Sequence, residues 1–158
     1  VNIAPILNIT PLRGPPTLPP AFQNAYVKSI RLGNADVLNG GLHLERQATA
    51  PLEVVIGTNP GALDGQVVSE RQGPVADLSV VLVPQIRRRI ELYRTTTTDS
   101  NGRFHFDRLS PGDYKVFSWE EVEDGAWYDS EFLRSYENQG VPVRILAGRT
   151  DNTRVPVR

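Results

Sequence analysis

The most constraining feature of this chain is a turn, a strand and a second turn that follow one another in its second half. Asp99, Asn101 and Gly102 supply the side-chain hydrogen bonds and the tolerance of positive φ that a short hairpin turn requires. Pro111 and Gly112 mark the second turn, because Pro presets φ and Gly accepts conformations that other residues avoid. Aromatic and apolar residues alternate with polar ones along the strands, at Phe104, Phe106, Tyr114 and Val116. The pattern predicts paired strands of a β-sandwich and is structural rather than catalytic.

These residues resemble the motif T-D-x-x-G-x-F-x-F-x-x-L-x-P-G-x-Y of carboxypeptidase regulatory-like domains, which are transthyretin-like or Cna-B-like modules of bacterial secreted and surface proteins. The matching residues are Asp99, Gly102, Phe104, Leu109, Pro111, Gly112 and Tyr114. A second match, from Gly65 to Leu82, fits the opening motif of the family, and the resemblance extends over residues 59–158. It implies an all-β fold, an Ig-like or prealbumin-like antiparallel β-sandwich. Such modules usually serve as spacers, adhesion stalks or folding aids.

Charge and composition exclude several partners. The net charge is −1, and the 17 Lys and Arg residues form no stripe, so the chain offers no field that would attract nucleic acid. No run of about 18 apolar residues could span a membrane. Cys is absent, so the fold depends on packing alone. Because the chain begins with Val and contains no Met, we interpret it as a processed or excised mature piece whose targeting segment is gone.

Residues 1–20 are predicted to form an extended arm. Six of the 13 prolines lie there, which excludes a helix and favours an extended or polyproline-II backbone. Its first part is apolar at alternating positions, namely Val1, Ile3, Leu7 and Ile9. A solvated linker would be rich in Gly, Ser or charged residues instead. We therefore expect this arm to pack against something.

Residues 21–58 are predicted to form a partial β module. The expected strands are 25–32, a short piece near Val37, 41–46 and 51–56. About 35 residues are too few for a sandwich that is stable alone. This segment resembles the rear half of another such module, so we interpret it as an incomplete one.

Residues 59–158 are predicted to form the complete sandwich domain. The expected strands are 62–69, 78–83, 92–98, 103–107, 113–119, 141–146 and 152–157. One short helix is expected at 129–139, where Asp129 or Ser130 can cap its start. Phe132, Leu133 and Tyr136 fall on one side of that helix and would pack on the sandwich.

Trp119 and Trp127 lie within an acidic stretch and suggest a ligand face. Aromatic rings with nearby carboxylates suit a polysaccharide, and a cluster of acids can also form a calcium loop. The spacing lacks the rhythm of a calcium loop. We favour a third interpretation, in which both rings cover the end of the sandwich.

No catalytic, cofactor-binding or metal-binding residue is predicted. His43 and His105 each stand without partners at ligand spacing, so both are expected to be ordinary outward strand residues. Some Cna-B-like modules contain a Lys–Asn isopeptide bond, which the position of Lys115 in a middle strand disfavours here; Lys28 leaves that question open for the first half.

The leading hypothesis is a non-enzymatic extracellular or cell-surface structural protein. An incomplete module has an open sheet edge that invites another strand, and the arm has the alternation that a complementing strand needs. Pairing within one chain would give a monomer, whereas pairing with the next chain would give a head-to-tail filament, a homopolymer. The alternative is a carbohydrate-binding or adhesion module of a larger surface protein. A hydrolase is least favoured.

Overall fold

The computed structural model describes residues 24–41, 50–71 and 73–157. The chain divides into two compact units, Val1–Thr58 (unit 1) and Asn59–Arg158 (unit 2). Within the described residues, unit 1 has one sheet and unit 2 has two.

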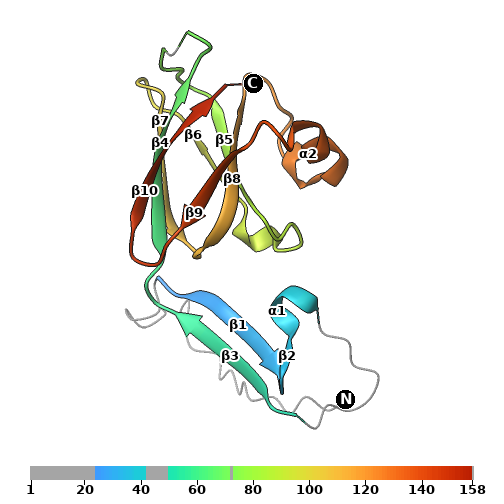
Figure 1. Cartoon of the computed structure of the whole chain (residues 1–158). Helices are drawn as coiled ribbons and strands as arrows, with labels where there is room; N and C mark the ends of the chain where they lie inside the picture. The colour runs from blue at the N-terminus through green and yellow to red at the C-terminus, as the bar shows by residue number, and fades with distance from the viewer. Residues whose placement is uncertain (1–23, 42–49, 72, 158) are drawn as a thin grey trace, which may run out of the picture. The chain divides into compact units, whose positions relative to one another are not determined.

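Unit 1 contains a small antiparallel sheet. Its elements are the strands β1 (Tyr26–Leu32), β2 (Ala35–Asp36) and β3 (Leu52–Gly57) and the one-turn helix α1 (Val37–Gly40). β1 pairs with both other strands, which gives the order β2-β1-β3 (Figure 1). The strands predicted at 25–32 and 51–56 are confirmed to within one residue.

The short strand predicted near Val37 is confirmed as β2, which ends at Asp36 because the chain turns into α1 at Val37. The carboxylate of Asp36 accepts hydrogen bonds from the backbone N–H groups of Leu38 at 3.0 Å and of Asn39 at 3.3 Å. Such a cap satisfies the first free donors of a helix and favours helical over extended backbone. The strand predicted at 41–46 lies outside the described residues, apart from Gly41.

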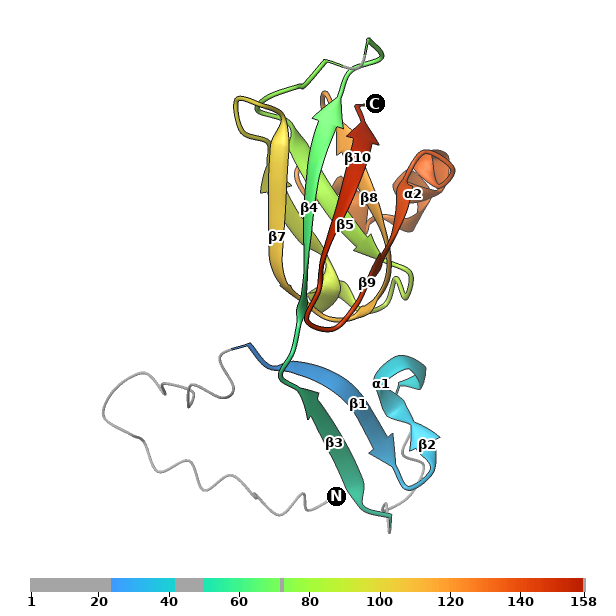
Figure 2. The same cartoon turned by 60° about the vertical axis from the view of Figure 1, so that its left-hand side comes forward.

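Unit 2 is a β-sandwich of two sheets. Its strands are β4 (Gly61–Val68), β5 (Ser79–Pro84), β6 (Arg94–Thr97), β7 (Arg103–Leu109), β8 (Gly112–Trp119), β9 (Val141–Ile145) and β10 (Thr150–Pro156). One sheet has the order β10-β4-β7 and the other β6-β5-β8-β9 (Figures 1 and 2). The predicted all-β sandwich is confirmed.

One strand pair departs from the predicted antiparallel arrangement. β10 runs parallel to β4, from Thr150 opposite Ala62 to Pro156 opposite Val68. The first and last strands of unit 2 therefore lie side by side and point the same way (Figure 2). The other strand pairs in the described residues are antiparallel.

The sheet β6-β5-β8-β9 is packed on both faces, which explains the sequence of β5. Val80 and Leu82 join the core between the two sheets. Val81 and Val83 belong to a second apolar cluster on the other face of this sheet, which we call the outer cluster. All four side chains are fully buried. A strand covered on both faces needs apolar residues at every position rather than at every second one.

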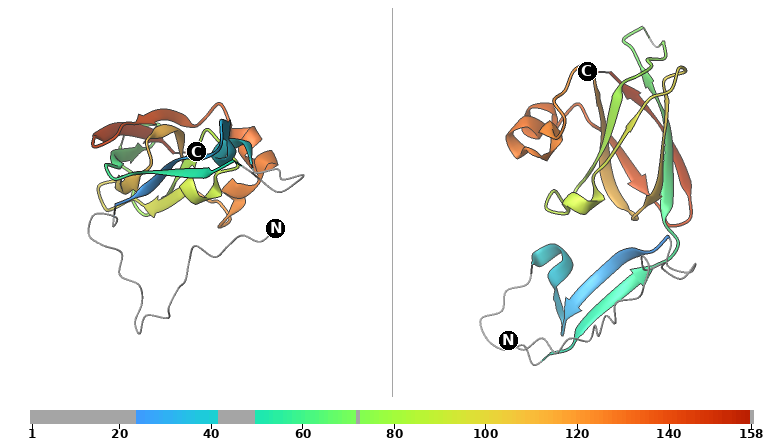
Figure 3. Two further views of the ribbon diagram at one scale, coloured as in Figure 1. Left: turned by 90° about the horizontal axis from the view of Figure 1, so that it is seen from below. Right: turned by 180° about the vertical axis from the view of Figure 1, so that it is seen from behind.

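The outer cluster is covered by helical segments, seen beside this sheet in Figure 3. The described helical elements of unit 2 are the 3₁₀ turns η2 (Ile90–Leu92) and η3 (Ala126–Tyr128) and the helix α2 (Ser130–Tyr136). The predicted helix is confirmed but ends earlier than predicted. Asp129 caps it by accepting a hydrogen bond from the N–H group of Glu131 at 2.8 Å. None of the helices in the described ranges has the length and apolar character needed to cross a membrane.

Candidate functional site

The family motif builds the turns that connect β7 of one sheet with β6 and β8 of the other. The Asp99 carboxylate accepts hydrogen bonds from the backbone N–H groups of Asn101 and Arg103, each at 2.8 Å. Gly102 has a φ of +68°, and a Cβ there would lie 2.8 Å from the carbonyl oxygen of Val67. Only Gly fits such a position without strain.

The remaining motif residues belong to the core and to the turn between β7 and β8. Phe104, Leu109 and Tyr114 are buried, while Pro111 and Gly112 lie at that turn. The hydroxyl of Tyr114 donates a hydrogen bond to the carbonyl oxygen of Ser110 at 2.7 Å. Burial raises the pKa of Tyr114 to about 12. These residues therefore serve the fold.

Trp119 and Trp127 do not form an open face, which contradicts the alternative interpretation of a ligand face at these two rings. Their side chains are 3% and 6% exposed. Trp119 stacks on Phe117 with ring centroids 5.3 Å apart and meets Tyr136 of α2 edge-on at 5.5 Å. Buried rings cannot stack on a ligand. Both belong to the outer cluster on one face of the sheet, whereas the favoured interpretation expected them at the end of the sandwich. In the described part of the chain, no group of three or more His, Asp or Glu side chains could hold a metal ion.

Lys115 takes part in a charged network rather than facing an Asn. Its ammonium group donates to the Glu137 carboxylate at 2.5 Å and to the Glu137 carbonyl oxygen at 2.7 Å. Arg87 holds the other carboxylate oxygen at 2.8 Å. The hydrogen bond from Lys115, with the charge of Arg87, lowers the pKa of Glu137. The network links the C-terminal end of α2 to β8.

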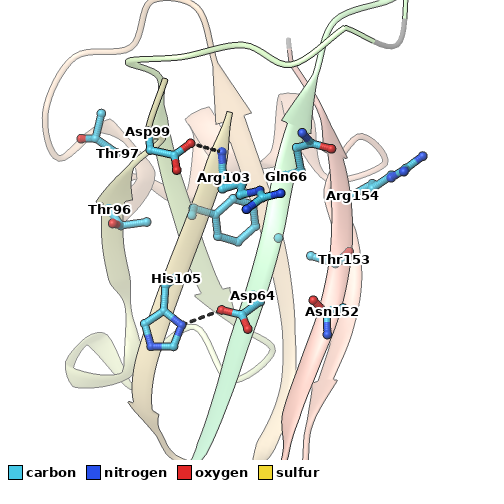
Figure 4. A pocket seen from close by; sticks show the side chains of 12 residues that line it. Asp64, Gln66, Thr96, Thr97, Asp99, Arg103, His105, Asn152, Thr153 and Arg154 are labelled. Atoms are coloured by element: carbon cyan, nitrogen blue, oxygen red, sulfur yellow. Dashed lines mark hydrogen bonds and ion pairs between the residues drawn. The ribbon is translucent and has the colours of Figure 1, made fainter. Parts of the chain in front are cut away.

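A polar groove of about 920 Å³ lies on the outer face of the sheet β10-β4-β7; we call it the sheet groove. Strand register arranges its side chains in two rows across the three strands. The first row is Asn152, Asp64 and His105, and the second is Arg154, Gln66 and Arg103. Residues that face each other across paired strands share a face of the sheet, and Figure 4 shows these six side chains together.

His105 has a partner that the sequence did not reveal. Its Nδ1 lies 2.6 Å from a carboxylate oxygen of Asp64 on β4 (Figure 4). The two residues are 41 positions apart, so only the register of β4 with β7 brings them together. The prediction of an isolated outward His is therefore right about its direction and wrong about its isolation. His43 lies outside the described residues.

Unit 1 presents a second surface, an apolar face on the ribbon of β1 and β3. Its members are Val27, Ile30, Leu32, Leu52, Val54 and Ile56, which face one another in three cross-strand pairs. We call this surface the apolar ribbon face. Exposure is 56% for Leu52, 49% for Val54, 48% for Ile56 and 37% for Val27. The predicted arm contacts, Val1, Ile3, Leu7 and Ile9, lie outside the described residues.

Solved structures with similar folds include the TIE protein of Bacillus anthracis, the major pilin subunit of Bacillus cereus and the minor pilin of Streptococcus agalactiae. Sequence identity to these is 14%, 14% and 16%, with TM-scores of 0.43, 0.40 and 0.42. The alignments cover 67%, 65% and 66% of this chain but 19%, 31% and 52% of the other chains. The chain thus spans between about a fifth and about a half of their length.

No curated protein matches this sequence. A family model does match it, that of the carboxypeptidase regulatory-like domain, over residues 62–119. This segment runs from β4 to the end of β8 and contains both motifs found in the sequence. Residues 62–119 of unit 2 therefore match the carboxypeptidase regulatory-like domain, as the two motifs predicted.

Proposed function

We propose that this chain is a non-enzymatic structural protein of the extracellular space or cell surface, whose copies join head to tail through unit 1. The observation that carries the proposal is the apolar ribbon face, where Leu52, Val54 and Ile56 are about half exposed. Contiguous exposed apolar surface marks sites of association. Unit 2 supports the proposal, because domains of the kind it resembles usually serve as spacers and stalks in secreted and surface proteins.

The edge of the ribbon offers a place for an added strand. In the order β2-β1-β3, the described residues include no strand on the outer side of β3. Backbone N–H and C=O groups on that side can pair with an incoming strand. Every second side chain of that strand would then extend the apolar ribbon face.

The sequence of the arm suits this role. Val1, Ile3, Leu7 and Ile9 occupy odd positions, as does Pro5. If the even residues pair with β3, the missing donor of Pro5 points away from the ladder and costs no hydrogen bond. Burial of the four apolar side chains would contribute roughly 6–12 kcal/mol before ordering costs are subtracted.

The prolines that follow favour pairing with a neighbouring copy. Half of the residues between positions 11 and 20 are proline, namely Pro11, Pro15, Pro16, Pro19 and Pro20. Ten residues of polyproline-II backbone extend about 30 Å and resist bending. The six residues of β3 extend only about 20 Å. A stiff spacer longer than the strand favours the next copy over a return to the same edge, and such a heterologous contact gives an open filament.

The test compares the native chain with a variant in which Val1, Ile3, Leu7 and Ile9 are all changed to Ser. Negative-stain electron microscopy and light scattering are expected to show filaments for the native chain and particles of about 17.5 kDa for the variant. The matched control changes Asn2, Asn8 and Thr10 to Ser, and its filaments should persist. Native particles of one chain's mass at every concentration, or filaments that survive the four changes, would contradict the proposal.

A further inference from the structure

We propose that the sheet groove of unit 2 binds an acidic polysaccharide, whose uronic acid carboxylates are held by Arg103 and Arg154. The groove lies wholly within unit 2, on the face formed by β10, β4 and β7. The inference is independent of assembly through unit 1, because it rests on different residues and on a different kind of surface.

The acids of the groove are already engaged. Asp64 contacts His105 at 2.6 Å, and Asp99 accepts the two backbone hydrogen bonds of its turn. Neither carboxylate forms an ion pair with a guanidinium group of the groove, since the line from Asp99 to Arg103 in Figure 4 is the hydrogen bond from the backbone N–H group. Both carboxylates keep their charge, so two negative and two positive groups line the groove, and the two guanidinium groups are what it offers to an anion.

Arg103 and Arg154 are the two cations of the groove. Within the described ranges, neither guanidinium group makes a hydrogen bond or an ion pair. They flank Gln66 on the two neighbouring strands, in the second row of the sheet. Two strand spacings separate their backbones by about 10 Å, a distance comparable to the length of a disaccharide. A guanidinium binds a carboxylate through two parallel hydrogen bonds, so two such sites suit a chain with regularly spaced acids.

The other groups of the groove suit hydroxyls. Asn152 is exposed, Thr97 on β6 lines the same groove, and the His105 ring is 58% exposed. The Gln66 side chain donates to the carbonyl oxygen of Asn101 at 2.9 Å, which fixes its orientation and leaves its oxygen as an acceptor. An open groove with neutral donors and acceptors beside its charged groups fits an extended, hydroxyl-rich polymer better than an enclosed small molecule.

The experiment uses the intact chain in affinity electrophoresis and calorimetry with three polymers. Polygalacturonate carries carboxylates, dextran sulfate carries sulfates, and dextran is neutral. The native chain is expected to bind polygalacturonate in preference to both others. The double variant R103Q/R154Q should weaken that binding at least about tenfold, because two charge-assisted pairs are lost. The matched control R71Q/R149Q removes two exposed arginines outside the groove and should bind like the native chain.

Thermal unfolding of each variant checks that the exposed substitutions leave unit 2 folded. Failure of the native chain to bind polygalacturonate would overturn the inference, as would equal weakening by the control pair. Equal or tighter binding of dextran sulfate would show a general response to polyanions and would also overturn it. Unchanged polygalacturonate binding by R103Q/R154Q would show that the polymer binds outside the groove and would likewise overturn the inference.

Discussion

Unit 1 and unit 2 use the same kind of strand but differ in what covers it. In unit 2, Leu82 of β5 is fully buried between two sheets, and Val81 is fully buried on the opposite face. In unit 1, Leu52 and Val54 of β3 are about half exposed in a single sheet. Strand formation requires only the local pattern and a pairing partner, whereas burial requires a second layer. The described part of unit 1 has paired strands but no second layer that covers them. This difference is the basis of the assembly model.

The largest expected effect comes from Leu82→Ala. Loss of a fully buried Leu should lower the free energy of unfolding of unit 2 by about 2–5 kcal/mol, because a cavity remains. Leu52→Ala is the matched change in unit 1. It should lower the free energy of unfolding of unit 1 by no more than about 0.5 kcal/mol. Denaturant titration followed by tryptophan fluorescence measures unit 2, since both Trp residues lie there, and hydrogen exchange of the β1 amides under the same titration measures unit 1. Equal effects would show that the two units do not differ in this way.

A somewhat smaller effect is expected from Gly65→Ala. A Cβ at Gly65 would lie 2.1 Å from Cζ of Phe104, so the buried ring would have to move. Overpacking of this kind should destabilise unit 2 by about 1–3 kcal/mol in the same titration. Gly73→Ala is the control, because its Cβ would only touch Ser69 at 3.6 Å. A neutral Gly65→Ala would mean that the inner face of the sheet is less tightly packed than the structure indicates.

The buried phenol of Tyr114 should make unit 2 sensitive to alkali. Burial raises its pKa to about 12 in the folded state, against 10 in the unfolded chain. The unfolded chain therefore loses this proton first, and stability that is complete below pH 10 should decline as pH rises to about 12. Tyr114→Phe should remove that decline while it costs about 0.5–1.5 kcal/mol at neutral pH through the lost hydrogen bond to Ser110. Chemical denaturation between pH 8 and pH 12 measures both effects. An unchanged alkaline decline in the Phe variant would assign it to other groups.

The smallest expected effect comes from the surface network at Glu137. Its lowered pKa means that its ion pairs stabilise the fold above the unfolded value of 4.5 and are lost as pH falls below it. Glu137→Gln should lower stability by no more than about 1 kcal/mol at pH 7, because the side chain is 43% exposed. The deficit should disappear at low pH, whereas Glu120→Gln, an exposed control, should show none. A deficit that is constant with pH would point to packing rather than charge.

Local sequence patterns predicted the elements that local chemistry determines. The turn at Asp99 and Gly102, the cap at Asp129 and most strands of unit 2 follow from side-chain hydrogen bonds and alternation. The strand expected near Val37 is only two residues long, because Asp36 caps a helix that begins at Val37.

Long-range register was beyond such patterns. The parallel pairing of β10 with β4 and the contact of His105 with Asp64 depend on which strands lie side by side, which periodicity does not encode. For Trp119 and Trp127, the acidic neighbours suggested a ligand, while the packing of η3 and α2 against the sheet determined their burial. The sheet groove was missed for the same reason, because its six side chains come from three separate strands.

The most direct test of the assembly model is hydrogen exchange at β3. In the native chain at a concentration that gives assemblies, we expect slow exchange for the amides of Leu52–Gly57 that point away from β1. The variant with Ser at positions 1, 3, 7 and 9 should lose that protection, while the amides of β5 in unit 2 should exchange as before. Fast exchange at the outer edge of β3 in both proteins would show that no strand is added there and would contradict the model.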